Sequence, residues 1–428
     1  MRRAVITGAG AVSAFGVGLA AIFDGLAEGR AAVRPIRSFD ASTFPVRVAG
    51  EVPIAGIEAQ WLARELNGIS KGAEIAHAAA ADGALRDRKV AFALLAAAEA
   101  WRDAGTPPGL DARLSFAAGL EQAFLEDLAP LWTGHSVDWS KDAKAPLPPT
   151  RYRSTVDLGP RLVAKLLSLR APFFIHASAC AGGGLAVAHA ATLIERGEAE
   201  MVLCGGTDSM VNPLGIGGLS RIGAPSPRNE PDACRPFDRR RDGLAVGEGA
   251  AAFIVEEESL ARSRGARIRA RILGWGSTQD GYRATAPLPD GSAARRAMEL
   301  ALRRHGVAAN RVGYVNAHGT GTPLNDPAES LAINGALKGA TVPVSSIKGA
   351  VGHLMSASGA IELAACLLTF ERGILPGTAH HRELDPDCPI DVIGETPRRA
   401  QVEVVLSNSF GFGGQNVTIA LGHPEAAA

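Results

Sequence analysis

The sequence PFFIHASACAGGG, residues 172–184, joins a short apolar run to a cysteine and then to a glycine-rich segment. The apolar run is typical of a buried strand, and the residues after it favour a helix over 184–196. We therefore expect Cys180 at the junction of a strand and a helix. There the positive end of the helix dipole and unpaired backbone N–H groups favour the thiolate, which is the form that attacks an acyl carbon.

Strand-like and helix-like runs alternate along the rest of the chain. A helix is expected at 292–305, and strands are expected at 202–204, 251–255 and 313–316. This alternation is typical of buried parallel strands joined by crossover helices. The sequence therefore predicts the α/β class, with a mostly parallel sheet.

A charged stretch at 256–269 separates two parts that both contain strand–helix alternation. We predict an N-terminal half, residues 1–269, and a C-terminal half, residues 270–428. Residues 61–88 and 134–153 interrupt the periodicity, and irregular segments of this kind more often cover a site than build a core.

Composition limits the partners and the compartment. Because 44 basic and 44 acidic residues cancel, no nucleic acid or anionic membrane surface is expected as a partner, and no apolar run is long enough to span a bilayer. The five cysteines show no paired spacing, which predicts neither disulfides nor a metal site and favours a reducing, cytoplasmic location.

Three further motifs lie downstream of Cys180. His318 lies in NAHGTGT, residues 316–322, His353 ends SIKGAVGH, residues 346–353, and the glycine-rich NSFGFGG occupies residues 408–414. Taken alone, a cysteine is usually a small buried hydrophobe, and either glycine-rich motif is more often a packing or turn element. One nucleophile and two imidazoles at the ends of strands nevertheless form a candidate site.

These motifs, in this order, resemble the β-ketoacyl-acyl-carrier-protein synthases of the thiolase superfamily, closest to the elongating type II (FabF-like) enzymes. The resemblance extends from VITG, residues 5–8, through RPFD, residues 235–238, and GEGA, residues 247–250, to the loop at 408–414. It implies a duplicated thiolase-like five-layered αβαβα fold. It also implies decarboxylative Claisen condensation of an acyl thioester with malonyl-acyl-carrier protein, in fatty-acid or polyketide synthesis, with an aryl-polyene product as one alternative.

The resemblance also implies roles for the catalytic residues. Cys180 would accept the acyl group, since a thiolate is both a good nucleophile and a tolerable leaving group. His318 and His353 would assist decarboxylation and stabilise the enolate oxygen. Lys348 and its acidic partner Glu362 would orient the histidines.

The loop near the C-terminus is implied to form part of the oxyanion hole. The backbone N–H groups of Cys180 and Phe412 would bind the thioester oxygen, and Phe412 would act as a gate. The glycines around it, Gly411, Gly413 and Gly414, would let the loop move.

The implied partners are acyl carrier protein and a second subunit. The subunit would form a homodimer, or a heterodimer with a chain-length-factor homologue. A small basic patch made of Arg88, Lys89, Arg221 and Arg228 would dock the acidic carrier protein. No metal or cofactor is expected, because the substrates arrive on the phosphopantetheine of the carrier protein.

Two other functions are considered. The first is a chain-length factor, which lacks the nucleophile, so the presence of Cys180 argues against it. The second is a thiolase that uses coenzyme A thioesters. Thiolases carry a second active-site cysteine near the C-terminus, and this chain has no cysteine after Cys388. Residues 119–124, together with those of the dimer mate, and residues 212–219 are expected to line the acyl pocket. Glu121 and Gln122 are more polar than the residues that elongating fatty-acid enzymes tend to have there, which favours a specialised acyl group over a saturated chain. Ser178 and Gln415 depart from the threonines usual in the family.

Overall fold

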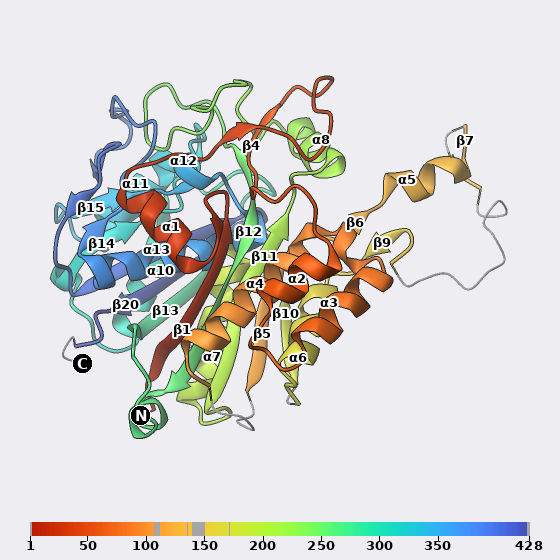
Figure 1. Cartoon of the computed structure of the whole chain (residues 1–428). Coiled ribbons are helices and arrows are strands. Elements are labelled where there is room, and N and C mark those ends of the chain that lie inside the picture. The colour runs from red at the N-terminus through yellow and green to blue at the C-terminus, as the bar shows by residue number, and fades with distance from the viewer. Residues whose placement is uncertain (1, 107–111, 135, 139–149, 171, 426–428) are drawn as a thin grey trace.

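The computed structural model describes residues 2–106, 112–134, 136–138, 150–170 and 172–425. Its main sheet runs through the whole molecule in the strand order β10-β5-β11-β12-β1-β13-β20-β19-β14-β15-β17. The two halves of the chain meet where β1 pairs briefly with β13, through Val5 with Arg271 and Ile6 with Ala270. Figure 1 shows the N-terminal strands and the C-terminal strands on opposite sides of this junction.

The main helices and most of the strands follow one another in the same order in the two halves, and the C-terminal half has one additional strand, β17. The N-terminal strands are β1 (Ala4–Ser13), β5 (Arg113–Ala118), β10 (Phe173–His176), β11 (Met201–Ser209) and β12 (Val246–Glu257). The C-terminal strands are β13 (Ala270–Gln279), β14 (Val312–Asn316), β15 (Pro343–Ser345), β17 (Asp391–Val392), β19 (Val404–Gly411) and β20 (Gln415–Gly422). The main helices are α4 (Arg88–Asp103), α6 (Leu158–Leu166), α7 (Gly182–Glu195), α10 (Ser292–Arg303), α11 (Asn325–Ala336) and α13 (Ser358–Arg372).

Strand directions are the same in both halves. β12 runs antiparallel to β1 and to β11, whereas β5 runs parallel to β11 and to β10. In the second half, β20 runs antiparallel to β13 and to β19, and β14 runs parallel to β19 and to β15. The expected mostly parallel sheet is therefore wrong, because the strands at the centre are antiparallel.

The helices form three layers around the two halves of the sheet. α4 packs on β1 and β12 and contacts α6, while α10 packs on β13 and β20 and contacts α11. Between the halves, α7 contacts β5 and β11 on one side and β13 and β20 on the other, and α13 contacts both β12 and β19. This is the duplicated αβαβα arrangement implied by the resemblance, while the division between residues 269 and 270 stays a prediction.

The two middle helices begin in the same way. α7 follows a 3₁₀ turn at Ala179–Ala181, and α13 follows one at Met355–Ala357. Both turns open on a residue in the left-handed region, Ala179 with φ 43° and Met355 with φ 45°. Because a side chain at positive φ is disfavoured, the surrounding packing must hold both turns.

Glycines let these two helices approach closely. A Cβ on Gly183 would lie 2.6 Å from the backbone nitrogen of Ala360, and a Cβ on Gly359 would lie 2.6 Å from that of Gly184. The helices therefore pack backbone against backbone at their N-terminal ends. Gly183 therefore has a packing role, although the close contact is between two helices and not the contact between helix and strand that these glycines could have served.

The two irregular segments have different outcomes. Residues 61–88 contain α3 (Gly72–Ala81) and most of α2 (Ala59–Glu65), whose Leu62 and Ile75 are buried in the outer core of the N-terminal half. They do not line the cavity that contains Cys180, so their expected covering role is wrong. Within 134–153, residues 135 and 139–149 lie outside the described residues.

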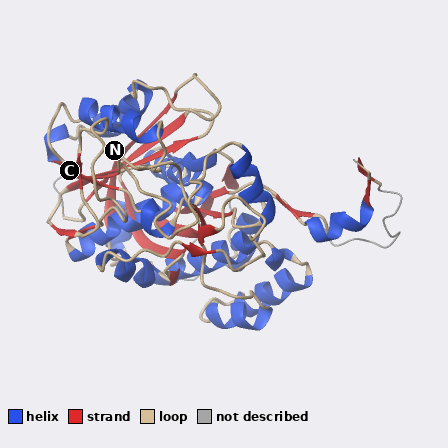
Figure 2. Ribbon diagram, turned by 90° about the horizontal axis from the view of Figure 1, so that it is seen from above, coloured by secondary structure: helices blue, strands red, loops and turns tan. Residues whose placement is uncertain are grey.

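An arm projects from the N-terminal half. It contains β6 (Gln122–Ala123), α5 (Leu125–Leu128) and β7 (Trp132–Thr133), and it stands clear of the body in two perpendicular views (Figures 1 and 2). Arg86 anchors its base through ion pairs with Glu126 and Asp127. Across the described chain, we find no helix both long enough and apolar enough to cross a bilayer.

Candidate active site

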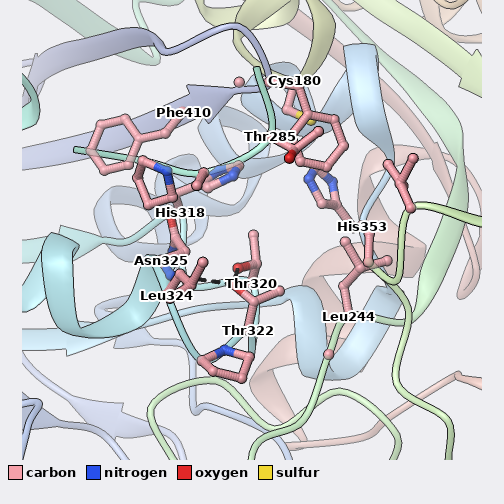
Figure 3. Close-up of a pocket in the computed structure, with 18 of the residues that line it drawn as sticks. Cys180, Leu244, Thr285, His318, Thr320, Thr322, Leu324, Asn325, His353 and Phe410 are labelled. Atoms are coloured by element: carbon pink, nitrogen blue, oxygen red, sulfur yellow. Dashed lines mark hydrogen bonds between the residues drawn. The ribbon is translucent and has the colours of Figure 1, made fainter. Parts of the chain in front are cut away.

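Cys180, His318 and His353 line one cavity of about 330 Å³. Figure 3 shows the two imidazole rings next to each other, with Cys180 above them in this view. Cys180 belongs to the 3₁₀ turn before α7, His318 follows β14, and His353 follows the short helix α12 (Lys348–Val351). The structure thus brings together three residues that are far apart in the sequence, with His353 lying 173 positions after Cys180.

The Cys180 thiol is buried, with 4% of its surface exposed. Burial raises its pKa to about 12, although the Lys348 ammonium and a hydrogen bond from the Phe412 backbone N–H both act to lower it. Burial therefore opposes the preference for the thiolate that was expected from the position before a helix.

Alkylation of Cys180 should reveal this raised pKa. Since the thiolate fraction grows tenfold per pH unit below the pKa, the rate with iodoacetamide should rise about tenfold per unit from about pH 7 to about pH 9.5. The rate is measured by mass spectrometry of the peptide that contains Cys180, with Cys180→Ala as the labelling blank. A plateau below pH 8 would instead indicate a resting thiolate.

Lys348 fixes the orientation of His318. Its ammonium is 1% exposed, donates to the backbone oxygen of His318 at 2.5 Å and lies 3.2 Å from Nδ1 of the same ring. It also forms an ion pair with Glu362. Because an ammonium can only donate, Nδ1 of His318 must accept, and the ring proton sits on Nε2.

The same argument applies to His353. Its Nδ1 accepts the backbone N–H of Met355 at 3.1 Å, which again leaves the ring proton on Nε2. The two rings meet edge to face, with centroids 5.3 Å apart and an interplanar angle of 82°. The site thus holds two Nε2–H donors beside one thiol.

Both imidazoles are neutral in the resting site. Burial lowers the pKa of His318 and of His353 well below the usual value, and the Lys348 ammonium acts in the same direction on each. Burial also raises the pKa of Glu362 to about 7, opposed by Lys348. Neutral imidazoles can donate to a developing oxyanion without first losing a proton.

Two carboxylates that the sequence analysis did not identify hold the turn around His318. Glu329 accepts the backbone N–H groups of His318 and Gly319, each at 2.8 Å, and also the side-chain amide of Asn408 at 3.1 Å. Asp326 accepts the N–H groups of Thr320 and Phe237. Their spacing of three residues on one face of a helix, directly after the HGTGT motif, was the available signal.

The glycine-rich loop lies over the start of α7. A Cβ on Gly411 would lie 3.2 Å from the backbone nitrogen of Ala181, so the loop touches the turn that carries Cys180. Gly413 and Gly414 have φ of 85° and 80°, where a side chain would be strained. Phe412 is partly buried in the same apolar cluster as Cys180.

The expected docking residues do not form one patch. Lys89 is buried and pairs with Asp87, and Arg88 uses its guanidinium to hold Glu248 and the backbone oxygens of Val52 and Ile54. A docking role for Arg88 and Lys89 is therefore wrong, because both side chains are committed inside the fold.

The other two candidates remain on the surface. Arg228 is exposed and pairs with Asp232, whereas exposed Arg221 precedes Ile222 and Gly223 at the cavity wall.

The predicted acyl pocket is only partly related to the observed cavity. Ile216 and Leu219 pack in the apolar cluster that contains Cys180, but residues 212–219 do not line the cavity. Residues 119–124 do not line it either, and Glu121 pairs with Arg153 on the surface.

Comparisons with known proteins identify the family of the chain. The family models described as "Beta-ketoacyl synthase, N-terminal domain" and "Beta-ketoacyl synthase, C-terminal domain" match residues 1–261 and 269–382. A 3-oxoacyl-[acyl-carrier-protein] synthase 2 of Synechocystis sp. is 36% identical, covering 98% of this chain and 97% of its own length. The tetracenomycin polyketide synthase ketoacyl synthase alpha subunit of Streptomyces glaucescens is 34% identical, covering 99% and 98%.

Solved structures show the same fold. A β-ketoacyl synthase from Burkholderia phymatum is similar with a TM-score of 0.83 and 31% identity, covering 99% of this chain and 100% of its own. The ishigamide ketosynthase/chain length factor has a TM-score of 0.82 and 31% identity over the whole of both chains. The chain therefore belongs to the β-ketoacyl synthase family and is a β-ketoacyl-acyl-carrier-protein synthase, an enzyme of decarboxylative Claisen condensation.

Proposed function

We propose that Cys180 carries the acyl group in a two-stage reaction and that His318 and His353 serve the decarboxylation. The observation that supports this most strongly is the cavity in which one thiol faces two imidazoles whose protons sit on Nε2. A metal or organic cofactor has no part in the proposal, because the N–H donors supply the charge stabilisation that the reaction requires.

In the first stage the Cys180 sulfur attacks the carbonyl carbon of the acyl thioester. The tetrahedral oxyanion is bound by the backbone N–H groups of Cys180 and Phe412, and its collapse expels the phosphopantetheine thiolate. The proton that leaves Cys180 ends on that thiolate. The acyl group is then held as a thioester of Cys180.

In the second stage the malonyl thioester enters the same cavity. Loss of carbon dioxide leaves the electron pair of the broken C–C bond on the α-carbon, as an enolate whose oxygen accepts hydrogen bonds from the Nε2–H groups of His318 and His353. The α-carbon attacks the acyl carbonyl, and the sulfur of Cys180 leaves as a thiolate, which takes up a proton from water to restore the thiol. The product is a β-ketoacyl-acyl-carrier protein.

The acyl group itself is the open part of the proposal, and one measurement addresses it. The protein is incubated with a panel of acyl-acyl-carrier proteins, and intact-protein mass spectrometry reports which acyl masses load onto Cys180. Loading of saturated chains supports a role in fatty-acid synthesis, while selective loading of polyketide or polyene intermediates supports a specialised pathway. Loading from free coenzyme A thioesters alone would favour the thiolase alternative.

Carrier-protein docking is proposed at the mouth of the cavity, beside Arg221. Arg221→Glu should slow transacylation about tenfold at low ionic strength by raising KM, because it reverses a charge facing an acidic partner, and salt should shrink the effect. Stopped-flow loading of Cys180 measures it. Arg303→Glu is the matched control, because Arg303 is exposed at the end of α10 and does not line the cavity. Equal losses in both variants would refute docking at Arg221.

A second subunit is proposed at the outer edge of β10. This strand ends the main sheet in the described chain, and Phe173 and Phe174 expose 40% and 38% of their surfaces on it. The arm beside it exposes Leu125 and Trp132. Apolar edge strands are ready to pair with another chain, so we infer a homodimer, or a heterodimer with a chain-length-factor homologue, which native mass spectrometry distinguishes.

We also infer a reducing, cytoplasmic environment. All five cysteines are buried and form no disulfide bond. Free thiols of this kind are typical of proteins in a reducing compartment, whereas proteins of oxidising compartments commonly contain disulfides.

A further inference from the structure

Ser358 is a buried hydroxyl that the reaction above does not use. It is the first residue of α13 and lies five positions after His353 in the sequence. Only 1% of its surface is exposed, and its Oγ lies 2.7 Å from Nδ1 of His353. This is shorter than the contact between the Met355 N–H and the same nitrogen, at 3.1 Å.

Counting protons fixes the direction of this hydrogen bond. The backbone N–H of Met355 can only donate, so Nδ1 of His353 presents its lone pair and carries no proton. The hydroxyl of Ser358 must then donate to that lone pair as well. Two donors at Nδ1 leave Nε2 as the protonated nitrogen, on the side of the ring that faces the cavity.

We propose that Ser358 is a positioning residue that holds His353 in the Nε2–H tautomer and aims this N–H at the enolate oxygen. This inference rests on the proposed role of His353 in decarboxylation. A catalytic imidazole is commonly oriented by a partner at its other nitrogen, which selects the tautomer and fixes the ring plane. Here a hydroxyl does so for His353, whereas an ammonium does so for His318.

The groups around His353 make a neutral donor useful. A carboxylate at Nδ1 would favour the charged imidazolium, whereas a hydroxyl donor favours the neutral ring. The titratable groups that face this corner of the site are His318, Lys348, Cys180, Asp208 through the Ser356 N–H, and Glu362 behind Lys348. Removing the Ser358 hydroxyl should therefore raise the pKa of His353.

The test compares Ser358→Ala with Ser356→Ala. Both remove a buried hydroxyl from the same turn, but the hydrogen bond of Ser356 to Asp208 comes from its backbone N–H, at 2.9 Å, and survives the change. Histidine-selective ¹⁵N labelling, with the His353 signals assigned through His353→Asn, reports tautomer and pKa in the resting protein. Ser358→Ala leaves the weaker Met355 N–H contact at Nδ1, so it should increase the fraction of the Nδ1–H tautomer and raise the pKa of His353, whereas Ser356→Ala should match the unmodified protein.

Kinetics give the second readout. In a Cys180→Gln background, Ser358→Ala should lower kcat for malonyl decarboxylation roughly five- to tenfold with KM unchanged, the effect of one lost hydrogen bond. With Cys180 in place, Ser358→Ala should leave acylation unchanged. Unaltered ¹⁵N signals of His353 in Ser358→Ala would overturn the inference, as would equal kinetic losses in both serine variants. Altered signals with unchanged decarboxylation would uphold the tautomer control and refute the proposed role of His353.

Discussion

Cys180→Ala should abolish acyl loading and condensation, lowering the rate by about 10⁴-fold or more, because Cys180 is the one thiol among the described residues that line the cavity. Cys180→Gln should do the same to condensation and yet raise malonyl decarboxylation, since the glutamine amide resembles the acylated cysteine. Intact-protein mass spectrometry measures the loading, and carbon dioxide release from malonyl-acyl-carrier protein measures the decarboxylation.

Cys204→Ala is the matched control for this experiment. Cys204 lies in β11, is fully buried and does not line the cavity, so its replacement should keep acyl loading. A Cys180→Ala protein that still forms β-ketoacyl product would exclude the covalent route. Condensation by that variant without a loaded intermediate would point to direct transfer between carrier proteins.

Glu362→Ala should cause the largest loss of stability among the site variants. It leaves the ammonium of Lys348 buried without its counter-charge, and breaking such a pair typically costs about 3–5 kcal/mol of unfolding free energy. Decarboxylation should fall as well, because Lys348 then no longer holds Nδ1 of His318 in one geometry. Urea unfolding and thermal melting measure the first effect, and carbon dioxide release measures the second.

Two further variants separate charge from packing. The exposed pair of Arg295 and Glu299 on α10 has the same kind of geometry at 2.7 Å, yet Glu299→Ala should cost less than about 0.5 kcal/mol. The double variant Lys348→Met/Glu362→Leu should recover most of the stability lost in Glu362→Ala but none of the decarboxylation. A double variant no more stable than Glu362→Ala would assign the loss to packing instead.

The sequence predicted the chemical groups of the site because each lies in a short motif whose residue types limit its chemistry. The structure places Cys180, His318 and His353 around one cavity, with Lys348 and Glu362 behind His318. Glu329 was missed because a glutamate inside a helix normally faces solvent. Only the three-dimensional path of the chain shows that this one lies under the His318 turn.

Strand direction could not be predicted from the sequence for a physical reason. β1 and β12 are buried along almost their whole length, so neither shows the alternation that usually marks an antiparallel strand. Burial on both faces comes from the helix layers above and below. A continuous apolar run is expected for any strand that is buried on both faces, whether it pairs with its neighbours in parallel or antiparallel.

The errors at Arg88, Lys89 and Cys180 also have one cause, which is burial. Arg88 and Lys89 read as a solvated basic pair, but Asp87 and Glu248 take both charges inside the fold. The position of Cys180 before a helix suggested a lowered pKa, yet enclosure by apolar groups reverses the direction. A linear sequence does not report how much water reaches a side chain.

The close contact between α7 and α13 at Gly183 and Gly359 sets the distance between the two turns that precede these helices. The turn with Cys180 leads directly into one helix, and the turn that follows His353 leads into the other. A side chain at either glycine would push the two helices apart and so increase the distance between the sulfur of Cys180 and the imidazole of His353. Acyl loading and decarboxylation therefore both depend on the same distance between the two helices. That distance is possible because Gly183 and Gly359 have a hydrogen atom where other residues have a Cβ.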